Sequence, residues 1–218
     1  MMHRIALLAS LCIPAVCVAA PETETDETQW ETTSSDVNEG PLRILQSPPG
    51  KPAHHHVNRL TIAPDSVESG WIAMDQCHYD IDPVPLVEIT YAPEKTRELR
   101  VTQTKNIAAA TADGHVVTLK EVGRQATVCV KAETRALTPQ GDGYVLRSGP
   151  FMRRFLDGYY PMHVTLDIRY PEALEVTDLF PPPGPGIRHT QYPGRLVLDL
   201  WFEGILETRF RFRDSPAQ

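Results

Sequence analysis

Apolar and polar residues alternate with a period of two through long stretches of the chain. The pattern is clearest in segments 162–170 (MHVTLDIRY) and 206–213 (LETRFRFR), and shorter examples are 87–91 (VEITY) and 126–131 (ATVCVK). Because successive side chains of a strand point to opposite faces, each segment predicts a strand that is buried on one side. Segment 196–202 with the Glu203-Gly204 pair predicts a hairpin onto the last strand, and Gly141-Asp142-Gly143 predicts another hairpin turn.

One segment has helical spacing instead. Between residues 148 and 160, apolar residues recur at intervals of three or four, and polar residues fall between them. Ser148 can cap a helix here, Pro150 is tolerated in its first turn, and Gly158 is tolerated near its end. The segment therefore predicts a short amphipathic helix.

Many short strands separated by Gly and Pro predict a mostly β fold, an antiparallel β-sandwich of immunoglobulin-like or related type. The length allows one large sandwich or two small β modules. The expected helix over 148–160 favours two modules, with a first β domain at 57–147 and a second β portion at 161–214.

The first residues have the order of a secretory signal peptide. Met1-Met2-His3-Arg4 is short and positive, and an uncharged, largely apolar run follows to Ala19. This run is shorter than the ~20 residues of a membrane-spanning helix. We expect cleavage after Ala19, because a cut after Ala20 would place Pro21 at the scissile bond. Neither Cys12 nor Cys17 follows a small residue, which disfavours a lipid anchor. The mature protein is then periplasmic or secreted.

Residues 20–56 predict a leader without a core of its own. Segment 21–41 has seven Asp and Glu residues and no Lys or Arg, and segment 41–56 is rich in proline. Such a chain buries too little apolar surface to offset the entropy of ordering. We expect a disordered acidic part, then a Pro-rich linker, with the fold beginning near Val57.

Charge and cysteine usage agree with export. Loss of the signal removes Arg4 and no carboxylate, which leaves 20 basic against 28 acidic residues and a net charge of −8. This balance, without a dense basic run, argues against a nucleic-acid partner. Cys12 and Cys17 depart with the signal, so Cys77 and Cys129 are expected to form a disulfide, with a buried thiol or a nucleophile as alternatives.

The run His54-His55-His56 is a candidate metal site, because neutral imidazole binds zinc, copper or nickel. Its setting weakens the hypothesis. Adjacent side chains in an extended segment point in different directions, and a tight site needs three or four converging groups. We expect no cofactor, with a metal on this run as the weaker hypothesis.

No motif in the sequence names a reaction. A Gly-x-Ser-x-Gly motif and a phosphate-binding loop are both absent. An exported hydrolase or metal-dependent enzyme would instead bring a histidine beside an aspartate. The candidate histidines are His78, His115, His163 and His189.

Two groups of arginines form a candidate anion-binding or partner-binding face. They are Arg153, Arg154, Arg209, Arg211 and Arg213. Outward-facing Asp167, Asp199 and Glu207 are expected to neutralise them across the strands. Segment 180–186 (FPPPGPG) is interpreted as a stiff connector rather than as a docked polyproline segment.

These features favour a non-catalytic exported β-sandwich protein that acts in binding, as an adaptor or in envelope assembly, because such folds present loops and edges to partners. The expected partner is an envelope protein or a glycan, without nucleic acid and without a transmembrane segment after signal removal. The alternatives are an exported enzyme and a metal carrier that uses His54, His55 and His56.

Overall fold

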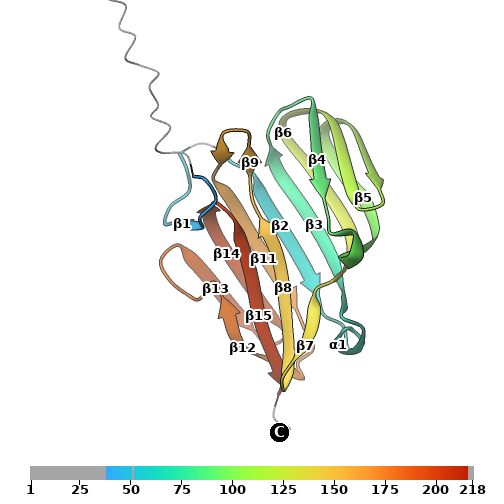
Figure 1. The fold of residues 1–218 in the computed structure, drawn as a ribbon, viewed down its shortest axis with the longest axis vertical. Coiled ribbons are helices and arrows are strands. Elements are labelled where there is room, and N and C mark those ends of the chain that lie inside the picture. Colours follow the sequence, from blue (N-terminus) through green and yellow to red (C-terminus); the bar gives the residue numbers. More distant parts are fainter. Residues whose placement is uncertain (1–37, 51, 216–218) are drawn as a thin grey trace, which may run out of the picture. The chain divides into compact units, whose positions relative to one another are not determined.

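A computed structural model describes residues 38–50 and 52–215, most of which lie in β-strands (Figure 1). The mostly β prediction is confirmed. The signal peptide and most of the acidic leader lie outside the described residues. Helical structure within these ranges is limited to α1 (Ser66–Ser69) and a 3₁₀ turn at Pro93–Lys95. No helix in the part that the structure describes has the length and apolar character to cross a membrane.

Three sheets contain the strands. The nine-stranded sheet has, in spatial order, β1 (Arg43–Leu45), β14 (Arg195–Glu203), β11 (Met162–Arg169), β2 (His55–Thr61), β3 (Trp71–Ile81), β6 (Val116–Arg135) and β4 (Leu86–Thr90), with β13 (Ile187–Tyr192) paired to β14 and β5 (Thr96–Asp113) paired to β6. The four-stranded sheet has the order β12 (Leu174–Phe180), β15 (Leu206–Asp214), β8 (Gly143–Phe151) and β7 (Leu137–Gln140). A two-stranded hairpin joins β9 (Arg154–Phe155) to β10 (Gly158–Tyr159). The β2–β11 pair is parallel, and the other strand pairs are antiparallel.

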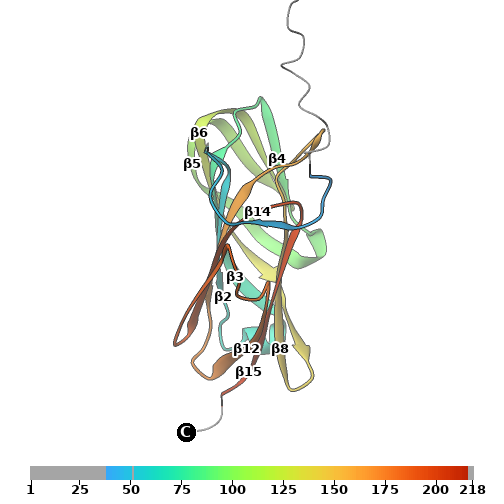
Figure 2. The same ribbon diagram turned by 90° about the vertical axis from the view of Figure 1, so that its left-hand side faces the viewer.

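The main core lies between the four-stranded sheet and the β14–β11–β2–β3 part of the large sheet, which appear as two layers in Figure 2. The alternation of apolar and polar residues along the strands supplies the side chains of this core. On β14 every second residue, Leu196 to Phe202, is at most 1% exposed. On β15 Phe210 and Phe212 are fully buried, while the arginines that alternate with them, at 209, 211 and 213, lie on the other face. Alternating side chains thus give each strand one core face and one solvent face.

A second core lies under the long β5–β6 hairpin. β4 pairs with the first half of β6, at Val116–Lys120, and β3 pairs with the second half, from Ala126 onward. Glu121 and Gln125, between the two halves, have positive φ angles of 51° and 53°. Apolar residues from both halves, including Leu119 and Val128, then share one buried cluster.

The predicted disulfide is confirmed. Cys77 on β3 and Cys129 on β6 lie directly opposite each other, with their Cα atoms 4.1 Å apart, and are bonded. Alternation along β3 places the pair on the face opposite to that of Ile72 and Met74, which belong to the main core.

The helix prediction over 148–160 is wrong. Ser148 lies within β8 and pairs with Thr208 of β15, so its backbone belongs to a sheet ladder and not to a helix start. Gly149 has a φ of +110°, which is outside the helical region. Beyond it the chain forms the β9–β10 hairpin, and Phe155 and Leu156 are exposed instead of sharing a buried face.

The division into two β modules near Ser148 is also not observed. β2 pairs with β11, and β8 pairs with β15, so strands from both sides of the expected boundary share both large sheets. The described residues, 38–50 and 52–215, lie in one compact unit. The structure corresponds to the alternative of one large sandwich.

One of the two predicted hairpins is correct. Gln140 pairs with Gly143 across the Gly141-Asp142 turn between β7 and β8. The other is wrong, because β14 and β15 lie in different sheets and Gly204 is the point at which the chain crosses between them. Gly204 has a φ of +86°, and a Cβ added there would lie 2.1 Å from the Pro41 carbonyl oxygen. This close approach explains the glycine without a hairpin.

Order begins before Val57, which corrects the linker boundary at residue 56. β1 pairs with β14, so that Ile44 lies opposite Phe202. Leu42 and Ile44 pack against the main core. The proline-rich composition of this segment obscured these two apolar contacts in the sequence.

Candidate functional site

The histidine run lies at the start of β2: His54 immediately precedes the strand, and His55 and His56 are its first two residues. His54 and His56 point inward, toward the layer between the sheets, and His55 points to the outer face. The three adjacent imidazoles therefore do not converge, as expected for an extended segment. Within residues 38–50 and 52–215, no group of three or more His, Cys, Asp or Glu side chains has a geometry suited to a metal ion.

His54, His56 and His78, with Gln76 and Tyr91, form what we call the inner cluster. The ring nitrogens His54 Nε2 and His78 Nδ1 are 2.8 Å apart, and Gln76 Nε2 donates to His56 Nε2 at 2.7 Å. The Tyr91 hydroxyl donates to the Gln76 carbonyl oxygen. His56 and His78 are each 5% exposed, and their rings meet edge to face with centroids 4.5 Å apart.

The inner cluster occupies the seam between the two cores. The His56 ring packs edge-on against Phe151, at the end of β8 and in the main core. His78 lies opposite Val128 of the second core. His78 Nε2 is buried and has no hydrogen-bond partner among the residues that the structure describes. The sandwich thus has a polar strip where its two apolar regions meet.

Burial keeps the inner histidines neutral. It lowers the pKa of His54 from 6.5 to about 4, with the Arg153 cation adding to the effect and the Asp82 carboxylate opposing it. Burial also places the pKa values of His56 and His78 well below 6.5, and the neighbouring histidines lower them further. The seam therefore holds uncharged imidazoles at neutral pH.

Arg153 closes the cluster at one end. Its guanidinium donates two hydrogen bonds to Asp82, at 2.9 Å and 2.5 Å, and a third to the Pro161 carbonyl at 3.3 Å. A bidentate arginine–carboxylate pair fixes both partners in orientation. It ties the β9–β10 region to the end of β3.

Four aromatic side chains on the opposite face form what we call the outer row. In order across β3, β2, β11 and β14 they are Tyr79, His55, His163 and Trp201, which are directly opposite one another in register. The rings of His55 and His163 stack with centroids 3.9 Å apart, and those of His163 and Trp201 stack at 4.5 Å. All four are half-buried.

Asp199 organises the outer row. It accepts hydrogen bonds from His163 Nε2 at 2.9 Å, Thr165 Oγ1 at 2.7 Å and Arg188 at 2.8 Å. These donors, above all His163, hold the pKa of Asp199 far below its usual range. Because the Thr165 hydroxyl gives its one proton to Asp199, it must accept from His55, whose Nε2 lies 2.9 Å away. The tautomer of His55 is thereby defined.

His55 is also neutral at physiological pH. Partial burial lowers its pKa from 6.5 to about 4, the neighbouring His163 contributes in the same direction, and the Asp199 and Asp80 charges oppose it. The row therefore presents a neutral His55 ring near the Asp199 carboxylate, which is already paired with His163 and Arg188.

The structure brings only one of the four candidate catalytic histidines beside an aspartate. His163 contacts Asp199, whereas His78 lies in the inner cluster on the opposite face. His115 is in the turn between β5 and β6. His189 on β13 has two buried ring nitrogens without partners, and burial lowers its pKa.

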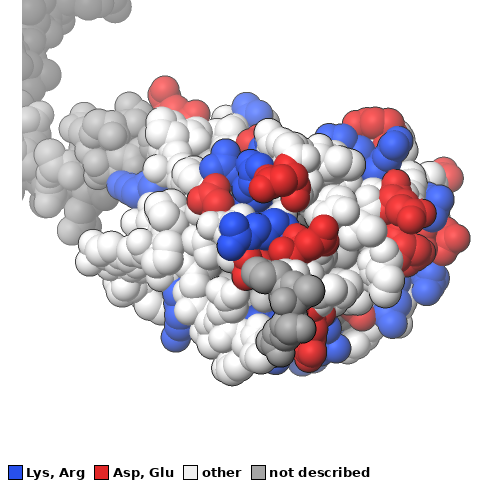
Figure 3. Space-filling view, turned by 90° about the horizontal axis from the view of Figure 1, so that it is seen from below, with Lys and Arg blue, Asp and Glu red and all other residues white. Residues whose placement is uncertain are grey.

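The candidate arginine face is largely occupied by ion pairs. Arg209 pairs with Asp178, Arg211 with Asp142 and Arg213 with Glu175. These are not the carboxylates expected from the sequence. Asp167 pairs with Arg195, and Asp199 pairs with Arg188. Arg154 lies over the Tyr159 ring. Seen from the end near the C-terminus, positive and negative side chains are intermixed and not segregated (Figure 3).

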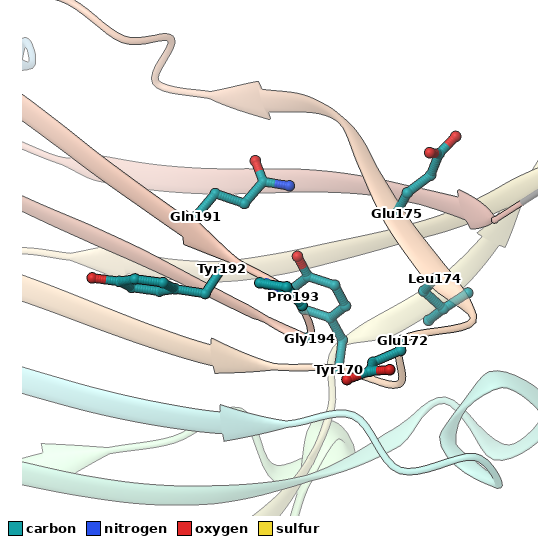
Figure 4. Close-up of a pocket in the computed structure, with 8 residues that line it drawn as sticks. All are labelled: Tyr170, Glu172, Leu174, Glu175, Gln191, Tyr192, Pro193 and Gly194. Carbon is teal, nitrogen blue, oxygen red and sulfur yellow. The ribbon is translucent and has the colours of Figure 1, made fainter.

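One hollow in the described surface is lined by residues of neither the inner cluster nor the outer row. It has a volume of about 470 Å³ and is lined by Tyr170, Glu172, Leu174, Glu175, Gln191, Tyr192, Pro193 and Gly194, as Figure 4 shows. Of its two carboxylates, Glu175 is already bound to Arg213. A hollow of about 340 Å³ lies on the outer face itself, where Arg59, Asp75 and Lys131 contribute to its lining.

The sequence did not single out Trp201, Thr165, Gln76 or Tyr91. Three of them left a signal: Thr165, Trp201 and Gln76 are two residues from His163, Asp199 and His78, respectively, and so share their faces. Tyr91 left none, because its partner Gln76 lies on another strand and no candidate residue is two positions away.

No family model matches the chain, and no curated protein matches it. Among solved structures, it resembles a mutant two-domain M1 zinc metallopeptidase bound to L-tryptophan, with 9% identity, a TM-score of 0.41 and coverage of 80% of this chain and 44% of that chain. A mutant M1 zinc metallopeptidase from Deinococcus radiodurans gives 10% identity, a TM-score of 0.40 and coverage of 80% and 43%. The chain thus spans less than half of these proteins, and similarity at this level assigns neither a family nor an activity.

Proposed function

We propose that this chain is an exported, non-catalytic β-sandwich protein that binds a glycan of the cell envelope through the outer row. The observation that carries the proposal is the row itself, four half-buried aromatic side chains on four adjacent strands. Strands are rigid supports, and side chains locked by further hydrogen bonds make precise sites.

The chemistry of the row suits a ligand rich in hydroxyl groups. Its imidazoles are held neutral or bound to Asp199, so hydrogen bonding and ring contacts dominate over charge. Aromatic bodies with a few well-placed polar groups are typical of small-molecule sites. The 340 Å³ hollow lies further along the same face: Arg59 in its lining is four residues from His55 on β2, or ~13 Å along the strand. A binding surface that extends from the outer row to this hollow is long enough for an oligosaccharide.

The Cys77–Cys129 disulfide supports the exported location, since such bonds persist in oxidising compartments. Expression of the full chain, followed by cell fractionation and mass spectrometry, tests it. We expect the exported fraction to contain a chain that begins at Ala20. An uncleaved chain in the cytosol would contradict export.

Binding is tested with a panel of defined peptidoglycan fragments and neutral oligosaccharides on the purified mature protein. We expect one class to bind, and W201A and H55A to weaken its binding at least ~10-fold, a loss of ~1.4 kcal/mol. The matched control is Y192A, which removes an exposed aromatic residue from the other hollow. Absence of binding, or equal loss in Y192A, would overturn the proposal.

A second candidate, an exported hydrolase, is favoured by the His163–Asp199 contact, because an aspartate that orients a histidine is the usual support of a general base. The same glycan panel distinguishes the two. Cleavage products that disappear in H163A would replace the binding proposal with the enzyme, whereas binding without products would support the binding protein.

A further inference from the structure

Strand β5 leaves one long edge of the nine-stranded sheet without a partner. It has 18 residues, pairs with β6 along one side, and has no other strand partner among the described residues. Figure 1 shows it at the margin of the sheet. An unpaired edge exposes a row of backbone N–H and C=O groups that another strand can bind.

The first half of this edge is blunted. Its pairing with β6 is irregular between Arg97 and Ile107, and Glu98 and Asn106 have positive φ angles of 56°. Arg97, Arg100 and Lys105 add charge. Bulges and basic side chains are the usual means by which proteins prevent edge-to-edge pairing.

The second half has none of these features. Segment 107–112 (IAAATA) contains no charge and no proline, and its φ angles are negative. Its pairing to β6 is regular from Ala109 to Asp113. Three consecutive alanines, Ala108 to Ala110, leave the backbone sterically open. This segment is therefore an unguarded edge, in contrast to the half that precedes it.

We propose that this edge pairs antiparallel with the same edge of a second copy of the chain, making a two-fold symmetric dimer. The segment is self-complementary. Pairing about Ala109 places alanine against alanine at residues 108–110 and Ile107 against Thr111. Isologous two-fold contacts are the commonest in homo-oligomers.

The dimer also covers part of the second core. Ile107, Ala110 and Ala112 pack against that core but remain partly exposed. A strand added to β5 shields them from water. The contact is short, below the ~1,200 Å² of a stable interface, so we expect a dissociation constant on the order of micromolar.

Sedimentation velocity on the mature protein, from about 5 to 500 µM, tests the proposal. We expect a monomer–dimer equilibrium. A109E places a carboxylate beside Lys120 within the monomer, because these residues are opposite on β5 and β6, but puts two carboxylates face to face in the dimer. It is expected to raise the dissociation constant at least ~10-fold. Q103E, with the same added charge in the blunted half, is the matched control.

Mixing A109E with A109K is expected to restore dimers, since opposite charges then meet across the two-fold axis. A wild-type chain that is monomeric throughout the range would overturn the proposal. Equal effects of A109E and Q103E, or failure of the mixture to associate, would overturn the assigned edge.

Discussion

Five histidines lie on two faces of one end of the central sheet and have different surroundings. Those of the inner cluster are sealed between two apolar cores and are kept neutral by burial. On the outer face, His163 is bound to Asp199, and His55 has its proton placed by Thr165. The face of the sheet to which each histidine points, and not its distance in sequence from the others, determines its surroundings.

Buried neutral histidines make the fold sensitive to mild acid. Their folded-state pKa values lie below 6.5, so the unfolded chain binds more protons as pH falls from about 6.5 toward 4. Each fully buried ring should then lower the unfolding free energy by up to about 1.4 kcal/mol per pH unit. Asp199, whose pKa is lowered, loses its contribution only below about pH 4.

Urea unfolding at pH 7, 6 and 5 measures this effect. We expect stability to fall with pH, and H56Q, which retains an acceptor for Gln76, to show a shallower dependence. H115Q, in the turn outside the inner cluster, is the control. A pH-independent free energy, or an unchanged slope in H56Q, would contradict the prediction.

The hydrogen bond from the Tyr91 hydroxyl to Gln76 leads to a second prediction about a single side chain. Y91F removes the donor to the Gln76 carbonyl oxygen and leaves that buried atom without it. We expect a loss of about 1–3 kcal/mol in urea unfolding. Y192F, at a residue that is 53% exposed, should change stability little; equal effects would show that the hydrogen bond is not the cause.

Among the elements, strands with strict alternation were predictable and irregular ones were not. Segments 162–170 and 206–213 became β11 and β15 because one set of alternate residues is buried. β5 gave no such contrast, since alanines are neither strongly apolar nor polar and bulges break its period. Residues 148–160 matched a helical period by coincidence: Ser148 and Phe151 pair with β15, and residues 154–159 pair with each other in the β9–β10 hairpin.

The crossing between β14 and β15 depends on Gly204. G204A adds a Cβ against the Pro41 carbonyl and imposes a left-handed φ on alanine. We expect a loss of at least about 2 kcal/mol in urea unfolding. Two controls separate the causes: G114A has positive φ but open space, and G50A has neither constraint. Equal losses in G204A and G114A would exclude the steric contact.

At the scale of the molecule, the sequence predicted the class of fold but not the strand order. The outer row requires the order β14–β11–β2–β3, and the parallel β2–β11 pair within it joins residues more than a hundred positions apart. No local pattern specifies such a pairing. The disulfide was predictable because only two cysteines remain after the expected signal, whereas the meeting of His55 with His163 and Trp201 was not.

The disulfide joins β3 to β6 across 52 residues and should stabilise the whole unit. We expect its reduction to lower the unfolding free energy by about 2–4 kcal/mol, chiefly through the entropy of the unfolded chain. Urea unfolding with and without reductant measures the difference. The C77A/C129A double variant should not respond to reductant, and a response there would assign the effect to another cause.

The parallel pairing of β2 with β11 has a consequence for biogenesis. A chain made from its N-terminus exposes β2 long before β11 exists, so the central sheet cannot close until three quarters of the polypeptide have emerged. Such non-local topology slows folding and leaves nascent strands open to aggregation. This protein is therefore expected to depend on a holdase chaperone during maturation, and a truncation that ends before Met162 should not acquire protease resistance.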